Sequence, residues 1–339
     1  MGCTFLSYED ISGAATVGEH VEAVRWAYRQ RGEGAPTAPR TSLQSDDPPG
    51  LLNSYIAILP ETGVMGGYTY SAGFGDEDAW LMTPLFDTES GRPIGLLDGA
   101  ALNTYKTGAA GAVGIDALAR EDARVLSVFG SGAQAYGQVL AAAEVRDFRE
   151  LYVYSPTPEH RENFAAAMER ETGIEAEAVG SPADAVTVAD VIVTATTAST
   201  PVFEADQLRP GTHINAIGQY DPQKRELPGQ VVRDATYVPD LRERAFQDAG
   251  SFLLAREEGL VDDDHIHGEL GDVLAGTVPG RTDRDEITIF DSGGTALETV
   301  ASAALAYEKA VEKGSGTELP FTPASEGYEG KKGNTAEEL

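Results

Sequence analysis

The sequence predicts an α/β protein with two sheets in two domains, and three observations carry this prediction. A short apolar run after Arg124 leads directly into a glycine-rich turn that begins at Gly130. From there to Phe290, strand-like and helix-like segments alternate, which is typical of βαβ units and of a parallel sheet covered on both faces. Before this region, four strand-like runs follow one another without long helices between them, and they indicate an antiparallel sheet in a separate α+β domain.

The elements of the first 119 residues follow from periodicity. Val21, Val24 and Tyr28 recur at helical spacing and predict an amphipathic helix near residues 19–30. Strands are expected at 51–59, 64–71, 79–86 and 93–98, with a turn at 88–91. A helix from about residue 104 to 119 is expected to cross to the second domain.

The second domain is expected to be of Rossmann type. It should contain one helix at 158–171 and strands near 124–130, 151–154, 189–195, 212–218, 235–239 and 286–290. Gly293 and Gly294 then precede an alanine-rich helix that reaches Tyr307 and is expected to return to the first domain. Residues 322–339 are polar and rich in Gly, Glu and Lys, which predicts a disordered tail.

The turn after the first of these strands carries a candidate dinucleotide site. Its residues match the pattern G-x-G-x-x-G/A, in which the glycines allow a sharp turn and a close approach of the backbone to a pyrophosphate. The N–H groups at the start of the following helix favour the same negative charge. An ordinary tight turn is the alternative, and the alternation of strands and helices argues against it. The candidate residues are Gly130, Ser131, Gly132, Ala133 and Gln134.

Composition excludes several classes of protein. The chain has 55 acidic and 25 basic residues and a formal net charge of −30, which repels phosphate backbones and argues against nucleic-acid binding. We interpret this charge as adaptation to high salt, with an acidic mesophilic protein as the alternative. No apolar stretch is long enough to span a membrane, and the N-terminus does not resemble a secretory signal, so we expect a cytoplasmic protein.

Disulfide bonds and metal sites are not expected. Cys3 is the single cysteine, so it has no partner within the chain. His265 and His267 lie near three aspartates at 262–264. They lack a third ligand at fixed spacing, so we predict no metal.

Several further segments, in this order, carry a family resemblance. They are Pro39-Arg40, 91–99, 106–110 ahead of 118–119, 130–134, 189–196, 210–218, 222–227 and 287–294. Together they resemble the ornithine cyclodeaminase/mu-crystallin family, which also contains alanine dehydrogenases and imine reductases. The resemblance implies a homodimer, with a substrate-binding and dimerisation domain at 1–119 and 300–321. It also implies an NAD(P)-binding domain at 120–299 and hydride transfer between nicotinamide and an amino acid or imine.

The resemblance assigns roles to residues of this chain. Arg40 matches an arginine that holds the substrate carboxylate with its guanidinium fork, although a surface arginine after a proline is the alternative. Gly293 matches a position at the substrate. Ala133 and Gln134 match the pyrophosphate contact, and positions near the nicotinamide nucleotide are matched by Thr194, Lys224 and Ser292. We place Gly218 in the cofactor site as well.

Three departures from the family pattern bear on the chemistry. Lys106 stands where arginine is usual, which keeps the charge but loses the bidentate fork. A further lysine is absent from residues 65–68, which leaves Tyr68 as the substrate-binding candidate at this place. Tyr220 replaces the usual acid, and Asp221 is one residue away, so that its side chain is expected to point elsewhere in an extended segment.

These departures disfavour cyclodeamination, which needs a well-placed acid/base near the nitrogen. We therefore predict an NAD(P)-dependent oxidoreductase acting on an imine or amino acid, with Lys106 and Tyr220 as candidate catalytic residues. An ornithine cyclodeaminase or alanine dehydrogenase proper is the alternative. An NADP-dependent small-molecule-binding protein with little turnover is the alternative of another class.

The end of the second strand of the parallel sheet bears on the cofactor. NAD enzymes place an acid there for the ribose hydroxyls, whereas this chain has Ser155, followed by Thr157 and Arg161. These side chains suit a 2′-phosphate, so NADP is favoured over NAD. A solvated Arg161, flanked by Glu159 and Glu162, is the alternative.

Overall fold

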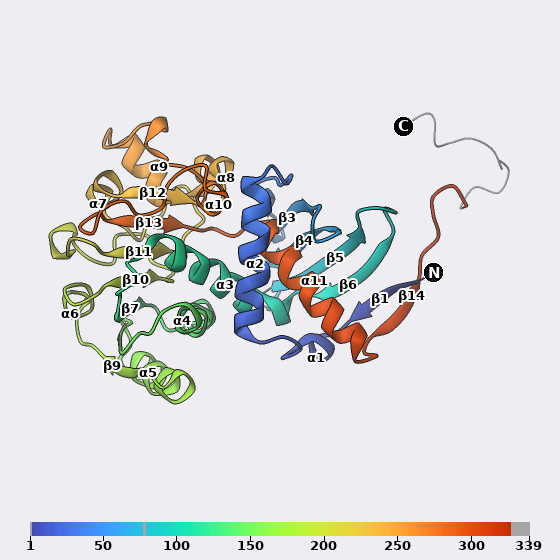
Figure 1. Cartoon of the computed structure of the whole chain (residues 1–339), viewed down its shortest axis with the longest axis horizontal. Helices are drawn as coiled ribbons and strands as arrows, with labels where there is room; N and C mark the ends of the chain where they lie inside the picture. The colour runs from blue at the N-terminus through green and yellow to red at the C-terminus, as the bar shows by residue number, and fades with distance from the viewer. Residues whose placement is uncertain (1, 77–78, 327–339) are drawn as a thin grey trace.

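The computed structural model describes residues 2–76 and 79–326, which form two seven-stranded sheets on either side of a set of helices (Figure 1). The elements in chain order are β1 (Gly2–Leu6), α1 (Tyr8–Ile11), α2 (Val17–Gly32), β2 (Thr41–Asp46), β3 (Pro49–Leu59), β4 (Val64–Ala72), β5 (Ala79–Asp87), β6 (Pro93–Asp98), α3 (Ala100–Leu118), β7 (Val125–Phe129), α4 (Ala133–Val145), β8 (Glu150–Tyr154), α5 (Pro158–Thr172), β9 (Glu175–Ala178), α6 (Pro182–Val186), β10 (Val191–Thr194), η1 (Ala205–Gln207), β11 (His213–Ala216), α7 (Gly229–Asp234), β12 (Thr236–Pro239), α8 (Arg242–Asp248), α9 (Gly250–Glu257), η2 (Asp263–His265), α10 (Leu270–Ala275), β13 (Thr288–Asp291), α11 (Ala296–Glu312) and β14 (Thr317–Pro320).

The first sheet is mixed and has the order β14-β1-β6-β5-β4-β3-β2. The four predicted strands are present as β3–β6 and pair antiparallel, whereas β1 runs parallel to β6. The helices α2 and α11 pack on its inner face, where Tyr28 and Val300 share one core with Tyr55 and Leu59. Three strands were not predicted, because β1 and β14 are short and β2 is exposed along nearly its whole length.

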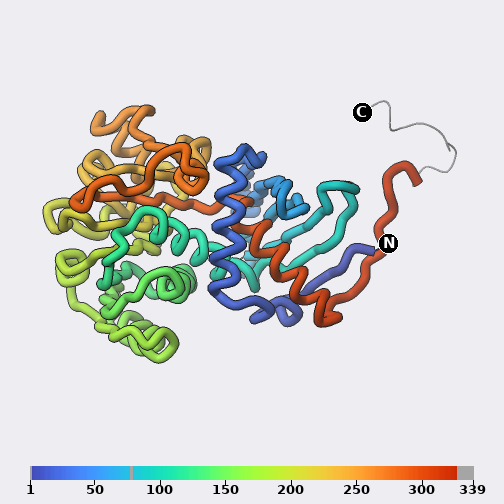
Figure 2. The backbone as a smooth tube through the Cα atoms, in the orientation of Figure 1, coloured from blue at the N-terminus to red at the C-terminus, as the bar shows by residue number. Residues whose placement is uncertain are grey.

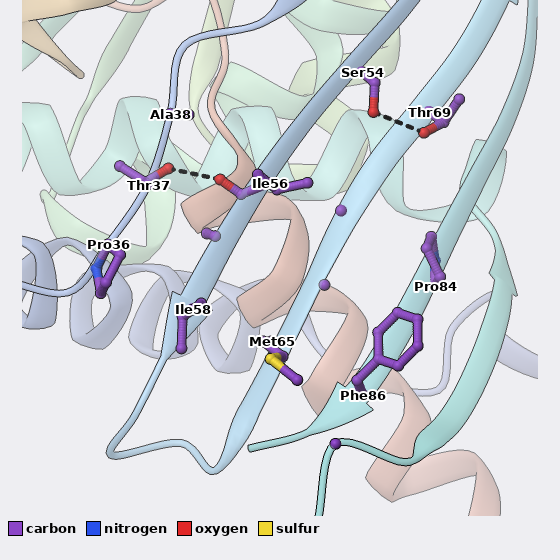
Figure 3. A pocket seen from close by; sticks show the side chains of 14 residues that line it. Pro36, Thr37, Ala38, Ser54, Ile56, Ile58, Met65, Thr69, Pro84 and Phe86 are labelled. Atoms are coloured by element: carbon purple, nitrogen blue, oxygen red, sulfur yellow. Dashed lines mark hydrogen bonds between the residues drawn. The ribbon is translucent and has the colours of Figure 1, made fainter. Parts of the chain in front are cut away.

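The outer face of this sheet is apolar and exposed. Pairing places Leu43 opposite Leu52 and Ile58 opposite Met65, so side chains of neighbouring strands lie on the same face. We call this surface the apolar outer face and define it by Leu43, Leu52, Ile56, Ile58, Trp80 and Met82, which are 38–69% exposed. Figure 3 shows part of it, a cavity of about 630 Å³ to which Ile56, Met65 and Phe86 contribute.

The second sheet is parallel throughout and has the order β12-β13-β11-β10-β7-β8-β9. Every strand predicted for this region is present, which confirms the Rossmann-type fold. β9 was missed because it has only four residues, and two of them are exposed glutamates. Val191 and Val193 pack into one hydrophobic core and Ile192 into another, so the sheet is buried on both faces.

Two long helices differ from their predicted bounds. α3 begins at Ala100, one turn before residue 104, because the Asp98 carboxylate accepts a hydrogen bond from the Ala100 N–H at 3.0 Å. α11 begins at Ala296 after an N-cap at Thr295 and continues beyond Tyr307 to Glu312. As Figure 2 shows, it runs beside α2 and away from the parallel sheet. The division into domains at residues 1–119 with 300–321 and 120–299 remains a prediction.

The predicted tail lies mostly outside the described residues. Residues 322–326 form no helix or strand, and residues 327–339 are not described.

Glycines allow α3 and α4 to cross with their backbones in contact. A Cβ on Gly108 would lie 2.2 Å from the Gly137 carbonyl oxygen, and a Cβ on Gly137 would lie 2.4 Å from the Thr104 oxygen. Only a residue without a side chain fits at these positions. This crossing joins the helix that carries Lys106 to the helix that follows the glycine-rich turn.

Candidate functional site

The glycine-rich turn follows β7 at the edge where the parallel strands end. Gly130 has a φ of +111°, and a Cβ there would lie 2.3 Å from the Ala195 carbonyl oxygen. Gly132 precedes α4 without a side-chain cap, and a Cβ there would meet nothing within 4 Å. Gln134 has a buried Oε1 with no hydrogen-bond partner in the part of the chain that the structure describes. Uncapped N–H groups beside open space fit the pyrophosphate of a dinucleotide.

The residues predicted to choose between NAD and NADP lie together after β8. The Ser131 hydroxyl donates to the Ser155 hydroxyl at 3.2 Å, and Arg161 Nη1 donates to the Ser155 carbonyl oxygen at 2.9 Å. Thr157 is the N-cap of α5 and makes no side-chain capping bond. Arg161 therefore bends back to the turn after β8 rather than standing away from it.

A buried carboxylate that sequence reasoning did not single out joins the loops after β10 and β11. Glu226 is 1% exposed and accepts hydrogen bonds from the Thr194 hydroxyl at 2.9 Å, the Thr196 N–H at 2.7 Å and the Gly218 N–H at 2.9 Å. Burial raises the pKa of Glu226, and the three donors act in the opposite direction. The Thr194 side chain is thus engaged with Glu226.

A cavity of about 690 Å³ lies between the two sheets. One wall comes from the mixed-sheet side and includes Arg40 and Asn53, and the other is the loop 218–224 after β11. Tyr220 and Asp221 both line it. This loop is not a strand, and the Asp221 carboxylate accepts a hydrogen bond from the Gln223 N–H of the same loop at 3.0 Å. Lys224, also predicted for the cofactor, forms an ion pair with Asp221 at 3.3 Å.

Arg40 lies at the wall of this cavity and is 6% exposed. Its Nε lies 3.1 Å from Asp248 Oδ2, and its Nη2 donates to the Gly293 carbonyl oxygen. The guanidinium carbon lies 4.9 Å from the centre of the Tyr220 ring. The structure therefore brings three predicted site residues, Arg40, Tyr220 and Gly293, together.

Lys106 lies deeper, on α3, and is buried with a carboxylate partner. Its Nζ is 3.2 Å from Glu298 Oε1 and 5.2 Å from the centre of the Tyr68 ring. Glu298 also accepts a hydrogen bond from the Tyr28 hydroxyl at 2.9 Å, and burial raises the pKa of Glu298. Ring contacts continue from Tyr68 to Tyr55 at 5.4 Å between centres, and Tyr55 lies 5.8 Å from the Arg40 guanidinium carbon.

A second buried network lies where β12 and β13 end. Arg244 is fully buried and contacts three carboxylates, with Nε 2.8 Å from Asp240, Nη2 2.6 Å from Asp291 and Nη1 3.4 Å from Asp248. Ser292, which was predicted to lie near the nicotinamide nucleotide, is buried and donates its hydroxyl to Asp240 at 3.0 Å. Sequence reasoning missed Arg244, and it has no motif by which it stands out.

Within residues 2–76 and 79–326, no group of three or more His, Cys, Asp or Glu side chains is arranged to hold a metal ion. His265 and His267 instead contact the carbonyl oxygens of Val232 and Pro279. No helix within the same ranges is long and apolar enough to cross a bilayer.

The parallel sheet with its glycine-rich turn, facing a second sheet across a cavity, defines a two-sheet dinucleotide-binding fold. The particular family follows from comparison. The model of the ornithine cyclodeaminase/mu-crystallin family matches residues 3–314, and the chain belongs to this family.

Individual relatives support this placement. The Delta(1)-pyrroline-2-carboxylate reductase of Bacillus cereus is 35% identical over 267 residues, which cover 78% of this chain and 79% of the relative. The structure of the Thermococcus litoralis enzyme of the same name, in complex with NADH and L-proline, has a TM-score of 0.88 and 32% identity. It covers 93% of this chain and is itself covered completely. An archaeal alanine dehydrogenase dimer with bound NAD has a TM-score of 0.89 and 31% identity, covering 95% of this chain and all of the relative.

Proposed function

We propose that this protein is an NAD(P)-dependent oxidoreductase that interconverts an imino acid and the corresponding amino acid. The observation that carries the proposal is the cavity that buried Arg40 shares with the loop after β11 of the dinucleotide-binding sheet. Relatives named as pyrroline-carboxylate reductase and alanine dehydrogenase both act at a carbon that bears nitrogen and a carboxylate.

The side chains suggest a division of roles. A bound nicotinamide supplies or accepts the hydride. The Arg40 fork can hold a substrate carboxylate with two hydrogen bonds while Asp248 keeps it oriented. Lys106 adds a second positive charge as a point charge rather than a fork. Tyr220, whose ring is half exposed in the cavity, is the group we propose to donate a proton to the imine nitrogen.

Turnover assays test this proposal and separate its alternatives. We expect NADPH absorbance to fall when the purified protein meets a cyclic imino acid, or a 2-oxo acid with ammonia. Formation of proline and ammonia from ornithine would instead show a cyclodeaminase. Binding of NADPH without turnover of any of these substrates would show a small-molecule-binding protein.

For the cofactor, we propose a preference for NADP over NAD. The support is the absence of an acid at residue 155 and the position of Arg161 beside it. Two relatives of known structure are described with bound NADH or NAD, so the preference has to be measured on this chain. We expect Arg161→Ala to weaken NADPH binding but not NADH binding, and Ser155→Asp to reverse the preference. Equal affinity of the wild type for both cofactors would contradict the proposal.

We further propose a homodimer that forms through the apolar outer face. Six large apolar side chains stand exposed there, and patches of this kind mark protein–protein interfaces. The archaeal alanine dehydrogenase is described as a dimer. We also propose a cytoplasmic location, because the chain has a single cysteine. The net charge of −30 supports adaptation to high salt.

A further inference from the structure

One buried acid, Glu226, contacts Gly218 at the cavity wall and differs from the other buried acids near it in its partners. Glu298, Asp248, Asp240 and Asp291 each lie within 4.0 Å of a lysine or arginine nitrogen. Glu226 forms no such pair among the described residues, since Arg225 pairs with Glu258 and Lys224 with Asp221. Its charge is therefore balanced only by the dipoles of neutral donors.

The hydrogen bonds around Glu226 favour its ionised form, against the burial that raises its pKa. Both oxygens accept: Oε1 from the Thr196 N–H, and Oε2 from the Gly218 N–H and the Thr194 hydroxyl. Two of these donors are backbone N–H groups, which cannot turn to accept a proton. Gly218 fits this arrangement closely, because a Cβ there would lie 2.4 Å from Glu226 Oε1.

The strand order places this acid on one half of the dinucleotide site. A dinucleotide crosses a Rossmann sheet where the strand order reverses, which here is between β7 and β10. The pyrophosphate turn follows β7, and Ser155 follows β8 on the side expected for the adenosine half. The nicotinamide half therefore lies toward β10 and β11, whose loops Glu226 joins.

We propose that Glu226 is a positioning residue for the nicotinamide half of the cofactor and that its buried charge favours the oxidised form over the reduced form. The proposal rests on the dinucleotide-dependent function proposed above. It follows because the oxidised nicotinamide ring is cationic and the reduced ring is neutral, and a buried carboxylate attracts a nearby cation with little screening.

The test measures dissociation constants of NADP⁺ and NADPH, by calorimetry and fluorescence, for the wild type and for Glu226→Gln. The glutamine side chain keeps the shape of the Glu226 carboxylate but loses its charge. Its amide nitrogen then faces a hydrogen-bond donor in place of an accepting oxygen. We expect both forms to bind more weakly and the oxidised form to lose about tenfold more than the reduced form. A purely structural role would weaken both forms equally, so an unchanged ratio in the folded variant overturns the proposal.

Control variants separate charge from fold. Glu258→Gln removes an equal charge from a more exposed carboxylate that pairs with the neighbouring Arg225, and its ratio should match the wild type. Glu226→Asp restores the charge and should restore the ratio.

Thr194→Val keeps the charge but removes one hydrogen bond, and should weaken both forms by the same factor. Thr194→Val serves as the test if Glu226→Gln does not fold. A change in the ratio of the NADP⁺ and NADPH dissociation constants in Thr194→Val would contradict the proposal. Failure of the wild type to bind either form would instead refute the proposed function.

Discussion

The two seven-stranded sheets are covered differently. The parallel sheet is buried on both faces, and its strands β10, β11 and β13 contain only buried residues. The mixed sheet is covered on its inner face, while its outer face exposes Ile56 and Trp80. The strands β3 and β4 contain no charged residue, although the chain carries a net charge of −30. The uncharged strands thus coincide with the face through which we propose that two copies of the chain bind.

The largest loss of stability is expected from a change at the edge of the parallel sheet. Arg244→Met leaves the carboxylates of Asp240 and Asp291 buried without their partner. We expect the free energy of unfolding to fall by about 3–5 kcal/mol, measured by urea denaturation. As a control, Arg233→Met breaks an exposed pair with Asp234 and should cost no more than about 1 kcal/mol. A loss of similar size in both variants would contradict this account of Arg244.

Protonation of a buried histidine is expected to affect the stability of the helices that cover the mixed sheet. His20 is buried on α2 with no partner for Nδ1, and burial lowers its pKa to about 4. Between pH 6.5 and 4 the unfolded chain therefore takes up a proton that the folded chain does not. Stability should fall as the pH falls through this window, by on the order of 3 kcal/mol from this group alone.

His20→Phe tests this contribution by removing the titrating ring. We expect the variant to lose less stability than the wild type between pH 7 and pH 4, as measured by urea denaturation across the pH range. Parallel curves for the two proteins would show that His20 does not titrate as described.

The proposed interface can be broken with one charge. Ile56→Arg places a cation in the middle of the apolar outer face, where its burial between two copies would be unfavourable. We expect the dimer dissociation constant to rise about 100-fold or more, measured by sedimentation. Val311→Arg, on α11, changes another exposed apolar residue and should leave the dimer intact. A monomeric wild type would refute the interface.

Salt is expected to have the smallest effect. Screening of the net negative charge should raise the melting temperature between low salt and about 2 M KCl. We expect a rise of roughly 4 °C, equivalent to about 1–2 kcal/mol, measured by thermal unfolding. A melting temperature that does not change with salt would argue against adaptation to high salt.

Local signals predicted most of both sheets. The strands β3–β6 follow from alternation and turns, and the parallel strands follow from apolar runs separated by helices. β1 and β14 were missed because they are short and β14 is mostly exposed, and because β1 pairs with strands far along the chain.

The candidate site was predictable only where a motif marks it. The turn at Gly130 and the position of Arg40 were predicted from residue patterns and family resemblance. The buried acid that pairs with Lys106 was not predicted, because Glu298 contacts Tyr28 across 270 positions and Lys106 across 192. Glu226 stood within a segment that was noticed, yet its partners Thr194 and Thr196 lie 30 or more positions away.

The glycine contact between α3 and α4 constrains how this molecule can move. Because the two backbones touch at Gly108 and Gly137, α3 and α4 cannot slide or separate without losing close packing. Lys106 and the glycine-rich turn at Gly130 should therefore move as one rigid body. Any closing of the cavity has to bring Arg40 and the mixed sheet toward that body, so a hinge is to be sought outside these two helices.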